Sequence, residues 1–276
     1  MKREDSTLAA RFFFNNCAVS LHIPGELKIS RTLKPEPGDV VLNRDFIPAC
    51  WPSEFIGEQS DFYKFLDVTS LSNASLIKKL TAIGYMLCNK LPRGGRRCRA
   101  FLCVNEDRVA CANGKSLFAK AIAQLCNPVF VFARDIIDSF DLSAVDENTN
   151  LLLLDDIPYS FDFCKVFNLC TEDWRIERKN KPELVIPRKM VPYLIITSNA
   201  SVAMLRKDGS FRRRFAVLEF SSMFGPENPI DKFIGRLMFQ EWDSSQWHMF
   251  DNLMFHCVLE YLSSYARGED VFDIYE

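Results

Sequence analysis

The chain has 276 residues and a hydrophobic fraction of 48%, which is typical of one large globular domain, or of one core with a small satellite, and argues against disorder. Its formal net charge of -2 gives no global basic field, so any contact with nucleic acid must come from local basic patches. The ten cysteines include no C-x-x-C pair, which excludes the usual zinc spacings, and we expect them to be reduced in a cytoplasmic protein. No apolar run reaches transmembrane length, so no membrane partner is expected.

Four segments differ in character along the chain. Residues 1–60 are interrupted by prolines and are expected to form short strands and loops, an irregular or linker segment and not a packed domain of their own. Residues 61–92 carry apolar side chains at helical spacing, which predicts a small helical region. Residues 93–225 alternate apolar runs with helix-like segments, whereas residues 226–276 are helical and rich in aromatic residues, which favours a C-terminal helical lid.

Short apolar runs in the third segment predict strands that are buried on both faces, as in a parallel sheet. These runs are Phe101–Val104, Val129–Ala133, Leu151–Leu154, Tyr193–Thr197 and Phe215–Phe220. Helix-like segments separate several of them, which predicts an α/β fold with a central parallel sheet flanked by helices.

The segment Asn-Gly-Lys-Ser follows the first of these runs and opens a predicted helix, as a phosphate-binding loop does. In such a loop the lysine reaches the β- and γ-phosphates of ATP and the serine ligates Mg²⁺. The candidate ATP-binding residues are Asn113, Gly114, Lys115 and Ser116. The full pattern G-x-x-x-x-G-K-[ST] fails at its first position, Val109, and for Gly-Lys-Ser alone an ordinary turn is an equally good interpretation.

Two further predicted strands end in polar residues. Asp155 and Asp156 follow Leu151–Leu154, where one carboxylate can hold Mg²⁺ and the next can deprotonate an attacking water. Asn199 follows Tyr193–Thr197 and can hydrogen-bond the γ-phosphate or that water. A strand that ends in an ordinary polar turn is the alternative in both places.

Three consecutive arginines, including Arg213 and Arg214, precede the last predicted strand. Guanidinium groups suit bidentate contact with phosphate, although an isolated basic cluster is more often a solvated turn. The phosphate loop, the acidic strand end, the Asn strand end and the arginines follow one another in a specific order, so four separate coincidences would be needed to explain them as ordinary turns.

With these parts in this order, the chain resembles the superfamily 3 helicases, a branch of the AAA+ ATPases. More narrowly, it resembles the helicase half of phage and prophage primase-helicases. The segments that carry the resemblance are Asn113–Ser116, Leu151–Phe163, Trp174–Pro182, Ile195–Asn199, Phe211–Phe220 and the tail around Trp242–Tyr261. The likeness runs from about Asp61 to Tyr265 and departs from the family pattern at Val109.

The resemblance implies an AAA+-like P-loop ATPase core over residues 93–225 and a collar-like helical region over residues 61–92. It implies a ring, in the family a hexamer, that hydrolyses ATP with Mg²⁺ at subunit interfaces. In such a ring Arg213 or Arg214 would reach the γ-phosphate held by the neighbouring subunit, and Arg214 is the closer match to the family's Arg-Phe pair.

The resemblance also places a hairpin that reaches into the ring channel between the acidic strand and the Asn strand. Its basic residues, Arg178, Lys179 and Lys181, would follow the backbone of single-stranded DNA without reading its sequence. On the sequence alone, an exposed charged hairpin with no ligand is an equally good interpretation.

The function expected from the sequence is therefore an ATP-driven DNA helicase or translocase in the replication of a phage or mobile element. Because residues 1–60 are too few for a primase domain, any primase is expected to be a separate partner. Two alternatives stay open: a DNA-binding or loader protein that hydrolyses ATP weakly or not at all, which Val109 favours, and a nucleotide-dependent switch in a phage-defence system. The residues that favour the motor over the loader are Lys115, Asp155, Asp156 and Asn199.

Overall fold

The computed structural model describes residues 7–48, 59–91, 100–106, 113–132, 142–158, 161–178, 180–201, 209–269 and 272. The chain divides into two compact units, which are Met1–Leu91 together with Pro226–Glu276, and Pro92–Gly225. Within these described ranges, no helix is both long enough and apolar enough to cross a membrane.

A small sheet opens the first unit. In the described part of this unit its four strands are β1 (Leu8–Phe13), β2 (Ala18–His22), β3 (Glu26–Ser30) and β4 (Val40–Val41), in the order β3-β2-β1-β4. β1 pairs antiparallel with β2 and parallel with β4, and β2 pairs antiparallel with β3. The short strands predicted in this part of the chain are present, and they form one continuous sheet.

Helices make up the rest of this unit, and they are α1 (Asp61–Val68), α2 (Asn73–Leu87), α6 (Ile230–Ile234) and α7 (Ser244–Ala266). Ser60, Ser72 and Asp243 cap α1, α2 and α7 by accepting a backbone N–H of the first turn. The helices predicted over residues 61–92 are confirmed. The C-terminal lid is not shown by the described residues, because α6 and α7 belong to the same unit as α1 and α2.

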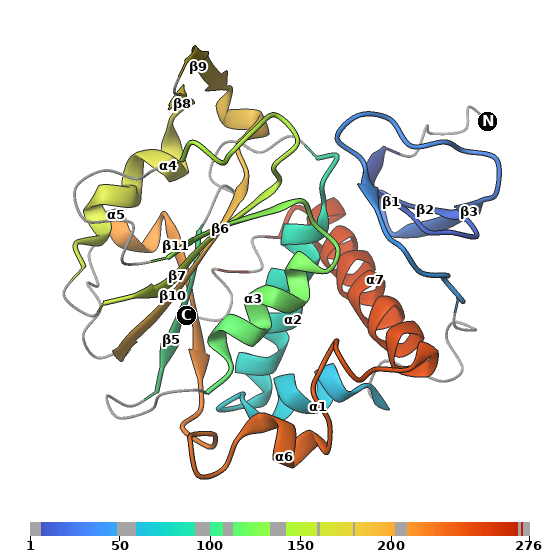
Figure 1. Ribbon diagram of the computed structural model, residues 1–276, viewed down its shortest axis with the longest axis vertical. Helices are drawn as coiled ribbons and strands as arrows, with labels where there is room; N and C mark the ends of the chain where they lie inside the picture. The colour runs from blue at the N-terminus through green and yellow to red at the C-terminus, as the bar shows by residue number, and fades with distance from the viewer. Residues whose placement is uncertain are drawn as a thin grey trace. The chain divides into compact units, whose positions relative to one another are not determined.

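The long helix α7 packs on both α2 and the small sheet (Figure 1). A Cβ built on Gly84 of α2 would lie 2.1 Å from the carbonyl oxygen of Cys257, so only glycine permits this approach. On the sheet side, the rings of Phe12 and Phe46 each have their centroids 5.2 Å from that of Phe255. These apolar contacts join the N-terminal strands to a helix more than 200 residues later in the sequence.

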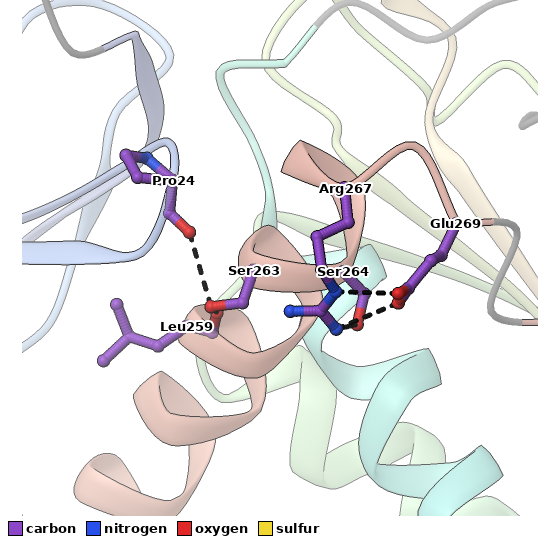
Figure 2. A network of polar contacts seen from close by, with 6 residues as sticks. All are labelled: Pro24, Leu259, Ser263, Ser264, Arg267 and Glu269. Atoms are coloured by element: carbon purple, nitrogen blue, oxygen red, sulfur yellow. Dashed lines mark hydrogen bonds and ion pairs between the residues drawn. The ribbon is translucent and has the colours of Figure 1, made fainter.

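Polar contacts add to this packing at the C-terminal end of α7, where Figure 2 shows Ser263 pointing at the turn between β2 and β3. The Ser263 hydroxyl lies 3.4 Å from the carbonyl oxygen of Pro24 and 3.0 Å from that of Leu259. One turn later, the Arg267 guanidinium forms an ion pair with Glu269, with an Nε–Oε1 distance of 2.7 Å. The hydroxyl supplies a specific contact between helix and turn, whereas the ion pair is exposed and adds little stability.

The second unit is an α/β layer around a parallel sheet. In its described residues the strands are β5 (Ala100–Asn105), β6 (Pro128–Phe132), β7 (Leu151–Ile157), β10 (Tyr193–Ser201) and β11 (Phe215–Phe220), in the order β11-β5-β10-β7-β6. Every adjacent pair is parallel. Each strand predicted from an apolar run is present, and the α/β fold with a central parallel sheet is confirmed.

Helices and a hairpin cover the two faces of this sheet. On one face α3 (Lys115–Ala123) packs against β7 and β10, and its Phe118 ring meets Phe220 at a centroid distance of 5.8 Å. The other face packs on η4 (Phe163–Val166), α4 (Phe167–Thr171), α5 (Gly209–Arg212) and the base of the hairpin β8 (Trp174–Arg178)–β9 (Lys181–Ile186), which η5 (Arg188–Met190) follows. Figure 1 shows the hairpin projecting from this unit at the top of the view. Burial on both faces explains why β5, β7 and β10 are continuous apolar runs, whereas β6, at the end of the strand order, is also an apolar run but leaves Phe130 and Phe132 exposed.

Candidate nucleotide-binding site

Strand order decides which polar side chains meet at the carboxyl edge of the parallel sheet. Because β10 lies between β5 and β7, the ends of these three strands are neighbours although they are far apart in the sequence. Asn105 ends β5, Asp155 and Asp156 lie near the end of β7, and Asn199 lies near the end of β10. Ligands of parallel α/β sheets bind outside this edge.

Helix α3 begins at the same edge, with Gly114 as its N-cap and Lys115 as its first residue. Gly114 has a φ of 93°, in the left-handed region that favours glycine. Lys115 is only 6% exposed. Its Nζ donates to the side-chain oxygens of three asparagines: Asn113 at 2.9 Å, Asn199 at 3.3 Å, and Asn105. An ammonium group beside a helix N-terminus gives this point a positive potential that favours an anion.

The Asp155 carboxylate is held by two hydroxyl groups from different elements. Ser116, the second residue of α3, donates its Oγ–H to Asp155 Oδ1 at 2.7 Å. Thr197 of β10 donates its Oγ1–H to the same oxygen at 2.6 Å. Hydroxyl and carboxylate oxygens are the ligands that Mg²⁺ takes in phosphate-binding sites, so the residue types at this point fit that ion.

Asp156 has an unusual backbone conformation. Its φ is 57°, in the left-handed region that few residues other than glycine adopt, and it coincides with a register shift between β7 and β10. Its backbone N–H donates to Thr197 Oγ1 at 2.9 Å, and its carboxylate accepts from Asn199 Nδ2 at 2.8 Å. The irregularity turns the exposed Asp156 carboxylate toward Asn199, and backbone strain of this kind often occurs at functional sites.

These hydrogen bonds form one continuous path across the sheet edge. The Asn199 amide accepts from Lys115 on one side and donates to Asp156 on the other, so it links a cation to an anion. From Asp156 the path continues through the Thr197 hydroxyl to Asp155, and from Asp155 to Ser116 of α3. The structure thus brings together a buried ammonium group, a hydroxyl and a carboxylate that share a hydrogen bond, and a second carboxylate with an adjacent amide.

Two members of this cluster were not singled out by sequence reasoning: Asn105 and Thr197. Asn105 is fully buried, and besides Lys115 its Oδ1 accepts from Asn113 Nδ2 at 2.6 Å. A signal was present for each, because both are polar residues at the end of an apolar run, as Asp155 and Asn199 are. Which of these polar ends face one another depends on strand order, which the sequence pattern does not contain.

Arg213 and Arg214 lie at the opposite edge of the same sheet. They directly precede β11, whose first residue, Phe215, pairs with Ala100, the first residue of β5. β5 has six residues, so at about 3.3 Å per residue the two edges are roughly 16–20 Å apart. Neither arginine therefore reaches the Lys115 site of its own chain in this structure.

The two arginines differ in their surroundings. The Arg214 guanidinium carbon lies 4.7 Å from the ring centroid of Phe167, and its Nη1 donates to the Ser210 carbonyl at 3.1 Å. Its Nε is buried and has no hydrogen-bond partner among the described residues. The Arg213 side chain is exposed and donates its Nε–H to the Gly209 carbonyl at 3.1 Å. Arg213 is consequently the more accessible of the two guanidinium groups, whereas Arg214 packs within its own unit.

The predicted basic hairpin is present as the antiparallel pair β8–β9, in which Arg178 pairs with Lys181. The Lys181 side chain is exposed. Arg178 is half-buried, and its Nε and Nη2 both donate to the Pro182 carbonyl at 3.2 Å. The hairpin thus offers Lys181 to solvent and holds Arg178 against its own backbone. Lys179 and Val109 lie outside the described residues.

Comparisons with known proteins complete the description. No family model matches this chain, and no curated protein matches it. Among solved structures, it is similar to the apo C-terminal region of NrS-1, with 14% identity and a TM-score of 0.47 over 96% of this chain and 72% of that one. It is also similar to the JCV helicase bound to a thiazolopyridinyl-phenoxy acetamide compound, with 13% identity and a TM-score of 0.37 over 76% of this chain and 61% of that one. Likenesses of this size do not assign an activity to the chain.

Proposed function

We propose that this chain is a Mg²⁺-dependent ATPase that drives movement on single-stranded DNA, working as a ring helicase or translocase in phage or mobile-element replication. The observation that carries the proposal is the hydrogen-bonded path at the carboxyl edge, which joins Lys115 to Asp155 by way of Asn199, Asp156 and Thr197. Each of these residue types has a defined task in phosphoryl transfer, and a structural turn would not need all of them in contact.

In this proposal α3 and Lys115 bind the nucleotide. The N–H groups at the start of α3 and the Lys115 ammonium would contact the β- and γ-phosphate oxygens, while Ser116 Oγ and Asp155 would hold Mg²⁺. Bound ATP supplies a phosphoanhydride bond, whose hydrolysis by water yields ADP and phosphate. Asn113, hydrogen-bonded to the Lys115 Nζ, would keep that ammonium at the phosphate-facing end of the helix.

Asp156 and Asn199 would act on the attacking water. Both side chains are exposed at the edge of the sheet, so water can approach them, and the 2.8 Å hydrogen bond holds the Asp156 carboxylate in one orientation. A carboxylate held in this way can accept the proton of a water as that water attacks the γ-phosphorus. Asn199 would orient the same water or the γ-phosphate through its amide.

A second copy of the chain would complete the site. Because Arg213 and Arg214 lie at the opposite edge of the sheet, either of them would contact a γ-phosphate only in the site of a neighbouring subunit, as in a head-to-tail ring. We assign this role to Arg213, because its side chain is exposed while Arg214 is engaged with Phe167. An arginine in this position contributes about 10³- to 10⁵-fold to the rate of related reactions.

Single-stranded DNA would contact the β8–β9 hairpin. Lys181 is exposed next to the turn, and a flexible ammonium binds phosphate without reading the base sequence. Arg178 would contribute charge from the side of the hairpin, and Lys179, which lies outside the described residues, would add a third positive charge.

An ATPase assay with and without single-stranded DNA tests this proposal. The wild-type chain should hydrolyse ATP only with Mg²⁺, and DNA should stimulate it. Lys115→Ala should lose turnover, whereas Lys120→Ala, which removes an exposed lysine from the same helix, should behave like the wild type. DNA binding with no turnover in the wild type would favour the loader, and normal turnover in Lys115→Ala would place the catalytic site elsewhere.

Mixing two inactive variants tests the shared site. Arg213→Ala should bind ATP without hydrolysing it, and a mixture with Lys115→Ala should regain part of the activity, because some interfaces then join an intact Lys115 to an intact Arg213. Arg214→Ala, run in parallel, should lower the melting temperature more than Arg213→Ala does, because Arg214 packs on Phe167. If both variants stay oligomeric by light scattering and no mixture recovers turnover, the shared site is wrong.

A further inference from the structure

The Thr197 hydroxyl stands between the two acidic residues of the candidate site. Thr197 is 1% exposed, so this hydroxyl is shielded from bulk water. It donates to Asp155 Oδ1 at 2.6 Å and accepts from the Asp156 backbone N–H at 2.9 Å. One buried side chain from β10 thus contacts the carboxylate of one acid and the backbone of the next.

The direction of these hydrogen bonds is fixed by the chemistry of a hydroxyl group. A backbone N–H can only donate, so it occupies a lone pair of Thr197 Oγ1. The single hydroxyl proton then points to Asp155, which as a carboxylate can only accept. Thr197 therefore presents one defined donor to Asp155, and rotation of its hydroxyl would break that contact.

The backbone of Asp156 explains why a side chain is needed here. At Asp156 the register between β7 and β10 shifts and φ becomes 57°, so its N–H does not continue the strand ladder. The Thr197 hydroxyl satisfies this N–H in place of a backbone carbonyl. The hydroxyl that accepts the Asp156 N–H also donates to the Asp155 carboxylate, so one side chain holds both the irregular backbone and that carboxylate.

Ser116 and Thr197 both donate a hydrogen bond to Asp155 Oδ1, and they differ in their second role. If the proposed function is correct, on which this inference rests, the Ser116 hydroxyl oxygen would also be a ligand of Mg²⁺, whereas the Thr197 hydroxyl already accepts the Asp156 N–H and would serve only to hold Asp155. We infer that Thr197 is the positioning residue that holds the Asp155 carboxylate ready for Mg²⁺. Thr197 itself touches neither metal nor nucleotide.

Nucleotide binding measured across a Mg²⁺ titration tests this inference without relying on hydrolysis. The probe is a fluorescent ATP analogue, and the purified full chain is compared with Thr197→Val, which keeps the shape and removes the hydroxyl. Thr197→Val should raise the half-saturating Mg²⁺ concentration about tenfold or more, since a hydrogen bond to a charged group is lost. Thr197→Ser, which restores the hydroxyl, should stay within about threefold of the wild type, and binding in EDTA should be equal for all three.

Ser198→Ala is the matched control, because Ser198 is also buried on β10 and its hydroxyl donates at 2.7 Å to a backbone carbonyl of β7, that of Ile157. It should melt at a lower temperature and keep the wild-type Mg²⁺ requirement. If Thr197→Val does not fold, Thr197→Ala, which leaves room for a water at the Asp156 N–H, takes its place with the same expected shift.

Three results would overturn the inference. An unchanged Mg²⁺ requirement in Thr197→Val, or in Thr197→Ala, would show that Ser116 and the backbone suffice to place Asp155. An equal shift in Ser198→Ala would show a general loosening of β10 against β7. Absence of Mg²⁺-dependent nucleotide binding in the wild type would instead refute the proposed function, and the inference with it.

Discussion

Replacing Asn199 by aspartate reverses the sign of one contact in the candidate site while keeping the shape of the side chain. In the structure, Asn199 Nδ2 lies 2.8 Å from Asp156 Oδ1, and Asn199 Oδ1 lies 3.3 Å from Lys115 Nζ. In Asn199→Asp the first contact joins two carboxylate oxygens, and the second becomes an ion pair. The matched variant Asn199→Ala removes both contacts and adds no charge.

The expected size of the effect follows from these contacts. Loss of a hydrogen bond to a carboxylate amounts to about 1.5 kcal/mol, which both variants share. Two like charges 4 Å apart repel by about 1 kcal/mol in water and about 4 kcal/mol at an effective dielectric constant of 20. Because both side chains are exposed and Lys115 offsets part of the repulsion, we take about 1 kcal/mol. Hydrolysis should therefore fall about tenfold in Asn199→Ala and roughly 50- to 100-fold in Asn199→Asp.

Steady-state ATP hydrolysis at saturating Mg²⁺ and ATP, repeated at several salt concentrations, measures this difference. The gap between the two variants should narrow as salt is added, because the Asn199→Asp defect contains a charge repulsion between exposed groups. Thermal melting should show both variants folded. The reasoning is refuted if Asn199→Asp hydrolyses ATP as fast as Asn199→Ala or faster, since the carboxylate would then be an acceptable neighbour for Asp156.

Three further predictions follow from other parts of the molecule. Asp155→Asn should weaken Mg²⁺-dependent nucleotide binding, whereas Asp156→Asn should spare binding and lower hydrolysis about 10²- to 10⁴-fold, as expected for the loss of a general base; equal loss of binding in both would contradict this division. Lys181→Ala should reduce the salt dependence of DNA binding by roughly one unit of slope, measured by fluorescence anisotropy, and leave basal ATPase unchanged; an unaltered slope would make the hairpin a solvated loop. Gly84→Ala would place a Cβ 2.1 Å from a backbone oxygen of α7 and should destabilise the first unit by about 3 kcal/mol, whereas Gly209→Ala, with nothing within 4 Å, should melt like the wild type.

Much of the second unit could be predicted from local patterns. The apolar runs predict β5, β6, β7, β10 and β11, and burial on both faces explains why the three central strands, β5, β10 and β7, show no alternation of polar and apolar residues. The start of α3 at Lys115 follows from the preceding glycine and the helical spacing after it. Polar residues at strand ends indicate the edge at which a ligand would bind, because parallel strands share their carboxyl edge.

For the N-terminal strands, the local sequence pattern predicts the strands themselves but not the element against which they pack. Their residues predict short strands, yet Phe12 of β1, and Phe46 after the last strand, both pack against Phe255 of α7. A helix of 23 residues that follows the whole α/β unit thus belongs with the first 91 residues of the chain. Burial of apolar surface depends on which elements meet in space, and periodicity along the chain does not specify the partner.

For the candidate site, the sequence by itself determined the types of residue present and the strand or helix end on which each one lies. The tertiary structure alone decided their contacts: that β10 separates β5 from β7, that Asn199 therefore joins Lys115 to Asp156, and that Thr197 contacts both acids. It also decided that Arg214 packs on Phe167 while Arg213 is exposed. The physical reason is that strand order, register shifts and side-chain hydrogen bonds join residues far apart in the sequence, and they depend on the free energy of the whole fold rather than on local preference.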